Sequence, residues 1–145
     1  MRTRFGLPGM ALALGLCFGG ASWGQIPDLG PCAPDVILGA WLVNANGHSG
    51  ALNVTSLDGT GKITGTMVFG TLVRQIQGFW SASRCQVTFL QASSLVLAVP
   101  GEMQFYTGYA YNYQGLKRLA GSFVAFAGTG GSAERHTFGW DAVRR

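Results

Sequence analysis

The stretch from Leu38 to Phe69 constrains the fold more than any other part of the chain. In it, apolar and polar residues roughly alternate, and Gly, Asn and Asp interrupt the alternation at two points. Alternation with a period of two residues is typical of β-strands whose two sides face different surroundings. The interruptions contain Asn46-Gly47 and Asp58-Gly59, which favour tight hairpin turns because Gly and Asn tolerate positive φ. The stretch therefore predicts three short strands joined by two turns.

The same pattern continues along the chain and predicts eight strands in all. Their ranges are Ile37–Asn44, Ala51–Ser56, Lys62–Phe69, Leu72–Trp80, Arg84–Gln91, Met103–Tyr113, Arg118–Phe126 and Arg135–Val143. Most links are short, and short links force neighbouring strands to run antiparallel. No segment has the period and length of an amphipathic helix. We therefore predict an all-β fold, an eight-stranded antiparallel up-and-down barrel, because closure removes the exposed edges of the sheet.

The composition suits one such domain. Of 145 residues, 48% are hydrophobic and 11% are charged, which leaves ample material for a core. The 23 glycines lack the three-residue period of collagen and fit turns and sheet bends instead. A barrel of eight strands can be just wide enough to hold one small ligand.

The first 24 residues have the pattern of a secretory signal peptide. Arg2 and Arg4 form a positive segment, Met10–Phe18 is an apolar run too short to span a bilayer, and small residues follow. Cleavage is expected after Gly24 or after Ala21. The sequence thus predicts an exported protein, periplasmic or extracellular.

The rest of the chain divides into an arm and a barrel. We predict a cleaved signal peptide over 1–24, an extended Pro-rich arm over 25–36, and the β-barrel domain over 37–145. Without the leader, the remaining cysteines are Cys32 and Cys85. Two cysteines in an exported chain favour one disulfide, which would attach the arm to the middle of the sheet.

Charge and motifs argue against several classes of function. The net charge is +4, and the basic residues are scattered, so nucleic acid is not an expected partner. No nucleophile motif, phosphate loop or metal-binding cluster is present, and Glu134 and His136 fit an exposed polar face of a strand. We therefore expect no enzyme activity, no cofactor and no metal.

Aromatic residues are numerous for a domain of this size. Tryptophans include Trp41, Trp80 and Trp140, and tyrosines cluster from Tyr106 to Tyr113. These side chains either fill the barrel or line an apolar pocket with a few polar groups that orient a ligand. Both interpretations fit the pattern.

Several short motifs, in order, resemble those of the avidins and streptavidin within the calycin barrels. Gly39-Ala40-Trp41 is similar to the GxW signature of the calycins, and a Gly-containing turn follows it at Asn46–Gly50. Ile63–Thr66 is similar to the TGT of the third avidin strand. Thr107–Tyr109 resembles the SGQY-type strand, and Gly139–Asp141 resembles the GHD near the end of the last strand. The resemblance covers most of the chain after the leader and implies an avidin-like barrel.

Avidins bind biotin in the open end of the barrel, so the resemblance also implies a binding site. It places Asn44, Ser49, Tyr106 and Asp141 near the polar or aromatic pocket positions. Met67 and Phe69 stand where the avidins carry a Tyr and a Ser that bind the ureido oxygen of biotin. This departure predicts a small hydrophobic or biotin-like ligand rather than biotin itself. The implied ligand-binding residues are Asn44, Ser49, Met67, Phe69, Tyr106 and Asp141.

Other interpretations of the same pattern stay open. An eight-stranded outer-membrane barrel needs longer strands with an apolar outer band, which several segments here lack. A calycin-type protease inhibitor would use Gln25–Asp35 as an arm that enters the protease. A structural protein would bind nothing, and the chain could form a homo-oligomer. The apolar segment Leu95–Val99 could be a lid over the barrel, a self-association patch or a buried loop.

Overall fold

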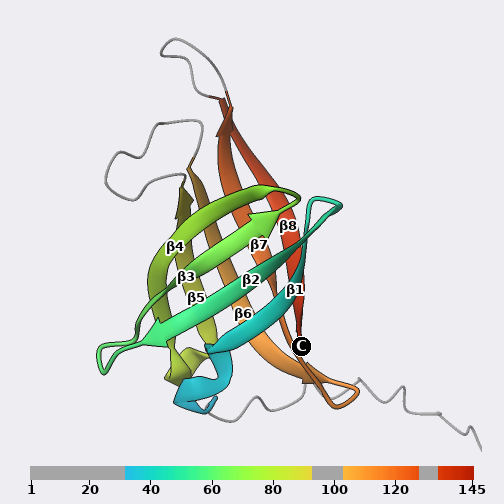
Figure 1. The fold of residues 1–145 in the computed structure, drawn as a ribbon. Helices are drawn as coiled ribbons and strands as arrows, with labels where there is room; N and C mark the ends of the chain where they lie inside the picture. The colour runs from blue at the N-terminus through green and yellow to red at the C-terminus, as the bar shows by residue number, and fades with distance from the viewer. Residues whose placement is uncertain (1–31, 93–102, 128–133) are drawn as a thin grey trace, which may run out of the picture.

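The computed structural model describes residues 32–92, 103–127 and 134–145, which form a closed barrel of eight antiparallel strands (Figure 1). The strands are β1 Gly39–Ala45, β2 His48–Leu57, β3 Lys62–Phe69, β4 Leu72–Ser81, β5 Gln86–Ala92, β6 Gln104–Tyr113, β7 Leu116–Ala127 and β8 Glu134–Arg144. Each strand pairs with its neighbours in sequence, and β1 also pairs with β8. The predicted all-β, eight-stranded up-and-down barrel is therefore confirmed.

Three predicted features lie wholly or largely outside these ranges. They are the leader over 1–24, most of the arm over 25–36, and the apolar segment Leu95–Val99. The helices that the structure does describe are two short 3-10 turns, and neither has the length and apolar character needed to cross a membrane.

The largest difference between predicted and observed strands is at β2, which begins at His48, three residues before the predicted Ala51. Two 3-10 turns account for the differences at the starts of β1 and β5. The turns are η1, Pro34–Ile37, and η2, Ala82–Arg84. The prediction that β1 begins at Ile37 and β5 at Arg84 is therefore wrong, as is the extended backbone expected for the end of the arm. A proline at the first position favours such a turn, because its φ is already fixed near the helical value.

The β1–β2 and β2–β3 turns differ in which of their residues have positive φ. Asn46 and Gly47 have φ of 50° and 80°, and they form a two-residue turn of the kind that matches the twist of the flanking strands. The turn that begins at Asp58 is longer. There, positive φ falls at Gly61, with a value of 85°, and the carboxylate of Asp58 accepts the backbone N–H of Thr60 at 2.8 Å. Asp58 therefore stabilises its turn through its side chain as well as through backbone hydrogen bonds with Gly61 and Lys62.

One end of the barrel is closed by η1, which lies at the lower end in Figure 1. The predicted disulfide between Cys32 and Cys85 is confirmed, with Cα atoms 5.3 Å apart, and it ties the residues before η1 to the β4–β5 connection. Ile37 is fully buried, and its carbonyl oxygen accepts the indole N–H of Trp41 at 3.0 Å. These contacts seal the barrel at this end.

Inward-facing side chains fill the barrel from the closed end to its middle. Along each strand, buried residues alternate with exposed or half-buried ones, as expected when successive side chains point to opposite faces. The inner side chains include Trp41, Leu52, Ile63, Met67, Ile76, Val87, Leu119 and Trp140, with no more than 4% of each exposed. This packed core leaves room for a ligand only toward the other end.

Candidate ligand-binding site

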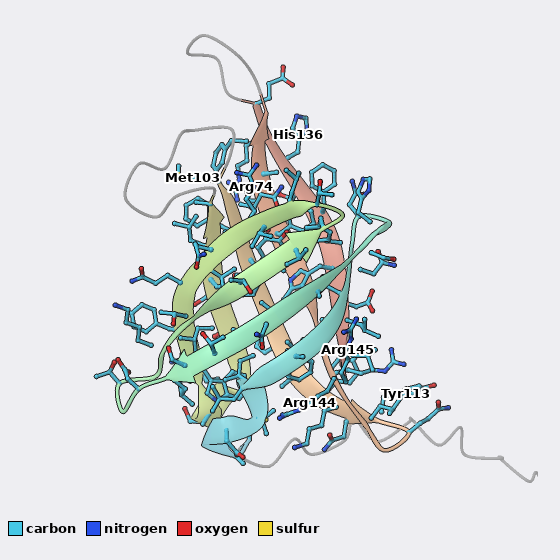
Figure 2. The ribbon with its side chains drawn as sticks, in the orientation of Figure 1. Arg74, Met103, Tyr113, His136, Arg144 and Arg145 are labelled. Carbon is cyan, nitrogen blue, oxygen red and sulfur yellow. A yellow bond between two sulfur atoms is a disulfide. The ribbon has the colours of Figure 1, made fainter. Side chains whose placement is uncertain are left out.

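A cavity of about 610 Å³ lies at the end of the barrel opposite η1. Residues of the β1–β2 and β3–β4 turns and the adjoining ends of β5 to β8 line it. The apolar and aromatic lining consists of Ala45, Phe69, Leu72, Tyr106, Phe123, Ala125 and Phe138, and the polar side chains are Asn46, His48, Ser49, Arg74, Gln91 and Gln104. Figure 2 shows Arg74 and His136 toward this end, whereas Arg144 and Arg145 lie toward the other. We call this space the mouth cavity.

One wall of the mouth cavity is formed by three rings of a row of four aromatic rings, and the fourth, Phe89, lies outside the lining. Phe89, Tyr106, Phe123 and Phe138 are direct partners across β5, β6, β7 and β8. Consecutive ring centroids lie 4.7, 4.8 and 5.3 Å apart, and the first two pairs are stacked. Trp140 meets two of these rings edge to face below the cavity. Such contacts hold large rings in fixed positions, so this wall is rigid and apolar.

Two glutamines lie side by side on the inner surface. Gln91 of β5 and Gln104 of β6 are partners in the strand register, and both line the cavity. The phenol of Tyr106 donates a hydrogen bond to Oε1 of Gln104 at 2.7 Å. Burial raises the pKa of the Tyr106 phenol well above its usual value, so this hydroxyl keeps its proton and remains a donor. Oε1 of Gln91 is buried and has no hydrogen-bond partner among the described residues.

Of the binding residues predicted from the sequence, the structure brings three together. Ser49, Phe69 and Tyr106 all line the mouth cavity. Met67 lies on the same face of β3 as Phe69, two residues deeper, where it is fully buried in the core. It therefore lies below the cavity and outside its lining.

Asn44 and Asp141 do not lie in the mouth cavity, which corrects the placement expected from the sequence. They are partners in the β1–β8 register, and both belong to the outward phase of their strands. In β8 the inward position is taken by Trp140, which is 4% exposed. Adjacent residues of a strand point to opposite faces, so the inward position of Trp140 places the carboxylate of Asp141 on the outer face, although the motif itself matches without a shift. A role for either residue in ligand binding stays a prediction.

The sequence analysis missed most of the polar lining. Arg74 and Gln91 are each two residues from a core position, Ile76 and Phe89 respectively, and so continue the inward phase of β4 and β5. That phase was readable in the sequence. Residue type points the other way, because charged and amide side chains at the end of an alternating strand usually face solvent.

The exposed polar face expected at the start of β8 agrees with the structure. His136 Nε2 lies 3.5 Å from Glu134 Oε2, and the side chains of His136 and Glu134 are about half and largely exposed, respectively. Within the described ranges, no three His, Cys, Asp or Glu residues are arranged to hold a metal ion. This region therefore offers no buried acid–base pair.

Comparison with known proteins gives one consistent result. No protein-family model and no curated protein matches the sequence. Among solved structures, the chain is similar to the rhizavidin–biotin complex, with a TM-score of 0.59 over 72% of this chain and 89% of that one, at 13% identity. The fold is that of the avidins.

Two further structures support this avidin-like fold. Xenavidin matches with a TM-score of 0.56 and 13% identity over 74% of this chain and 96% of its own. The short afifavidin–biotin complex matches with a TM-score of 0.56 and 12% identity over 79% of this chain and 99% of its own. The resemblance predicted from the sequence motifs is thus confirmed for the avidin-like barrel as a whole. Identities this low establish the fold and leave the ligand open.

Proposed function

We propose that this avidin-like barrel binds one small, largely apolar molecule in the mouth cavity and has no catalytic activity. The observation that carries the proposal is the cavity of about 610 Å³, lined by aromatic rings and a few polar groups above a packed core. Pockets of this size and composition are typical of small-molecule sites. A barrel that served only as a structural unit would gain stability by filling this space.

We further propose that biotin is a poor ligand for this cavity. Biotin is bound in the rhizavidin and short afifavidin complexes. Here, the residue of β3 that lines the cavity is Phe69, which has no hydroxyl, and Met67 lies beneath the cavity. A polar ligand group facing Phe69 would lose hydrogen bonds that it makes with water. Isothermal titration calorimetry with biotin is expected to show no nanomolar binding, and nanomolar affinity would contradict this part of the proposal.

A fluorescent probe tests whether the cavity binds apolar molecules. N-phenyl-1-naphthylamine is neutral, and its emission rises when it moves from water into an apolar site. We expect saturable binding with a stoichiometry of one probe per barrel. Ala125→Trp should abolish it, because Ala125 lines the cavity and a tryptophan there would occupy the space.

The matched control is Ala120→Trp. Ala120 lies on the outward phase of the same strand, β7, so the added indole leaves the cavity unchanged. Binding that survives Ala125→Trp, or that is lost equally in Ala120→Trp, would contradict a site in the mouth cavity.

We also propose that the protein is exported, with removal of residues 1–24. The disulfide between Cys32 and Cys85 supports this, because such bonds persist mainly in oxidising compartments. N-terminal sequencing of the protein recovered from its own host is expected to begin at Gln25 or at Ser22. A protein that retains Met1 would contradict the proposal.

A further inference from the structure

We propose that Gln91 selects the ligand of the mouth cavity by accepting a hydrogen bond from it. The carbonyl oxygen Oε1 of Gln91 would receive one N–H or O–H of an otherwise apolar molecule. The ligand class is therefore a neutral aromatic or aliphatic compound that carries one hydrogen-bond donor, such as an amide, an arylamine or an alcohol. This inference rests on the proposed function and gives it chemical specificity.

The burial of the Gln91 side chain is the first observation that supports this role. Gln91 is 5% exposed, and it is the one polar residue among the buried residues of the described chain. Its Oε1 lacks a hydrogen-bond partner there, although the side chain lines the cavity. A buried carbonyl without a donor lowers the stability of the fold, so its presence at a cavity wall indicates a partner that comes from outside the protein.

The neighbouring glutamine strengthens this argument. Gln104 lies directly across the β5–β6 ladder, and its Oε1 is already paired with the hydroxyl of Tyr106 at 2.7 Å. That hydroxyl therefore has its proton engaged and does not serve Gln91. The wall thus carries two carbonyl acceptors, one paired with Tyr106 and one that is buried without a hydrogen-bond partner among the described residues.

The rest of the lining restricts the ligand further. The rings of Tyr106, Phe123 and Phe138 offer an apolar surface beside Gln91. None of the described lining residues carries a carboxylate, so a cationic amine would find no counter-charge there. A neutral donor on an apolar body fits both features.

Two probes and two variants test the proposal. N-phenyl-1-naphthylamine has a single N–H, and N-methyl-N-phenyl-1-naphthylamine has none. Gln91→Met keeps the length of the side chain and removes its hydrogen-bonding groups. Gln77→Met is the control, because Gln77 is exposed on the outward phase of the adjacent strand β4.

We expect the native protein to bind the N–H probe about tenfold more tightly than the methylated probe, as one hydrogen bond to a buried acceptor would give. Gln91→Met should bind the two probes with about the same affinity, whereas Gln77→Met should keep the native preference for the N–H probe. Comparing the ratio across the variants cancels any steric effect of the methyl group. The melting temperature of Gln91→Met without probe should equal or exceed that of the native protein, since an unpaired buried carbonyl is removed.

The outcomes separate this inference from the proposed function. If the native protein binds both probes equally, or if Gln91→Met keeps the preference, the inference is wrong while the mouth cavity remains a binding site. If Gln91→Met melts at a lower temperature and loses both probes, Gln91 has a structural role and the inference is wrong. If neither probe binds the native protein, the proposed function fails as well.

Discussion

The indole N–H of Trp140 donates a hydrogen bond of 3.1 Å to the backbone carbonyl oxygen of Thr107. The two residues lie on β8 and β6, with β7 between them, so the indole spans the inner surface of β7 to reach its acceptor. Gly108 makes this possible. A Cβ atom at that position would lie 2.5 Å from Cζ2 of Trp140. The packing directly below the mouth cavity therefore depends on a residue without a side chain.

Gly108→Ala is expected to destabilise the protein by about 1–3 kcal/mol, the range for overpacking a filled core. The methyl group must displace the indole ring, which would weaken its hydrogen bond to Thr107 and its contacts with the aromatic row. Urea denaturation measures the change. The control is Gly139→Ala, because the nearest heavy atom to a Cβ there is 4.0 Å away, and its stability should be nearly native. Equal stability of the two variants would refute the packing argument.

The disulfide is expected to contribute about 4 kcal/mol to the free energy of unfolding. Cys32 and Cys85 are 53 positions apart, and a cross-link over a long loop restricts the unfolded chain strongly. The variant with both cysteines changed to serine should therefore unfold at a lower urea concentration. Reducing agent should shift the native protein to the same extent and leave the double variant unaffected. A native protein indifferent to reduction would contradict the prediction.

Stability is expected to fall at alkaline pH because of Tyr106. Burial raises the pKa of its phenol in the folded state, whereas in the unfolded chain the phenol ionises near its ordinary value of about 10. Below that pH both states keep the proton and the contribution is fully present. Above it the unfolded state loses a proton that the folded state retains, so unfolding becomes easier, by up to about 1.4 kcal/mol per pH unit. Tyr106→Phe should show a smaller decline in urea denaturation above about pH 10, and parallel curves would disprove the assignment.

The turn at Asp58 is expected to weaken at acidic pH. Its carboxylate accepts hydrogen bonds from the hydroxyl and the backbone N–H of Thr60 and from the backbone N–H of Lys62, and these lower its pKa. A lowered folded-state pKa means that the stabilisation is present at neutral pH and disappears as the pH falls through that pKa. Asp58→Ala should therefore melt below the native protein at pH 7 and approach it in acid. Asp35→Ala, which removes an exposed carboxylate that takes no part in this turn, should melt like the native protein at both pH values.

The sequence predicted several residues of the site, but it did not predict which residues of β8 point into the barrel. Tyr106 and Phe69 were assigned to the pocket from their motifs, and they do line it. Asp141 was assigned in the same way, yet its neighbour Trp140 occupies the inner position. Alternation alone says that these two residues face opposite sides. Which of them faces inward depends on the register of β8 against β1 and β7, a property of the assembled sheet.

The sequence by itself determined the strands, the tight turn at Asn46-Gly47, the closed barrel and the pairing of Cys32 with Cys85. The strands, the turn and the barrel follow from residue patterns along the chain, and the disulfide follows because only two cysteines remain after the leader. Only the tertiary structure decided the mouth cavity and its chemistry. The aromatic row and the pair formed by Gln91 and Gln104 bring together residues from separate strands, and their alignment exists only once the strand registers are set. Local patterns carry no information on such registers, because hydrogen bonds between strands and packing inside the closed barrel fix them together.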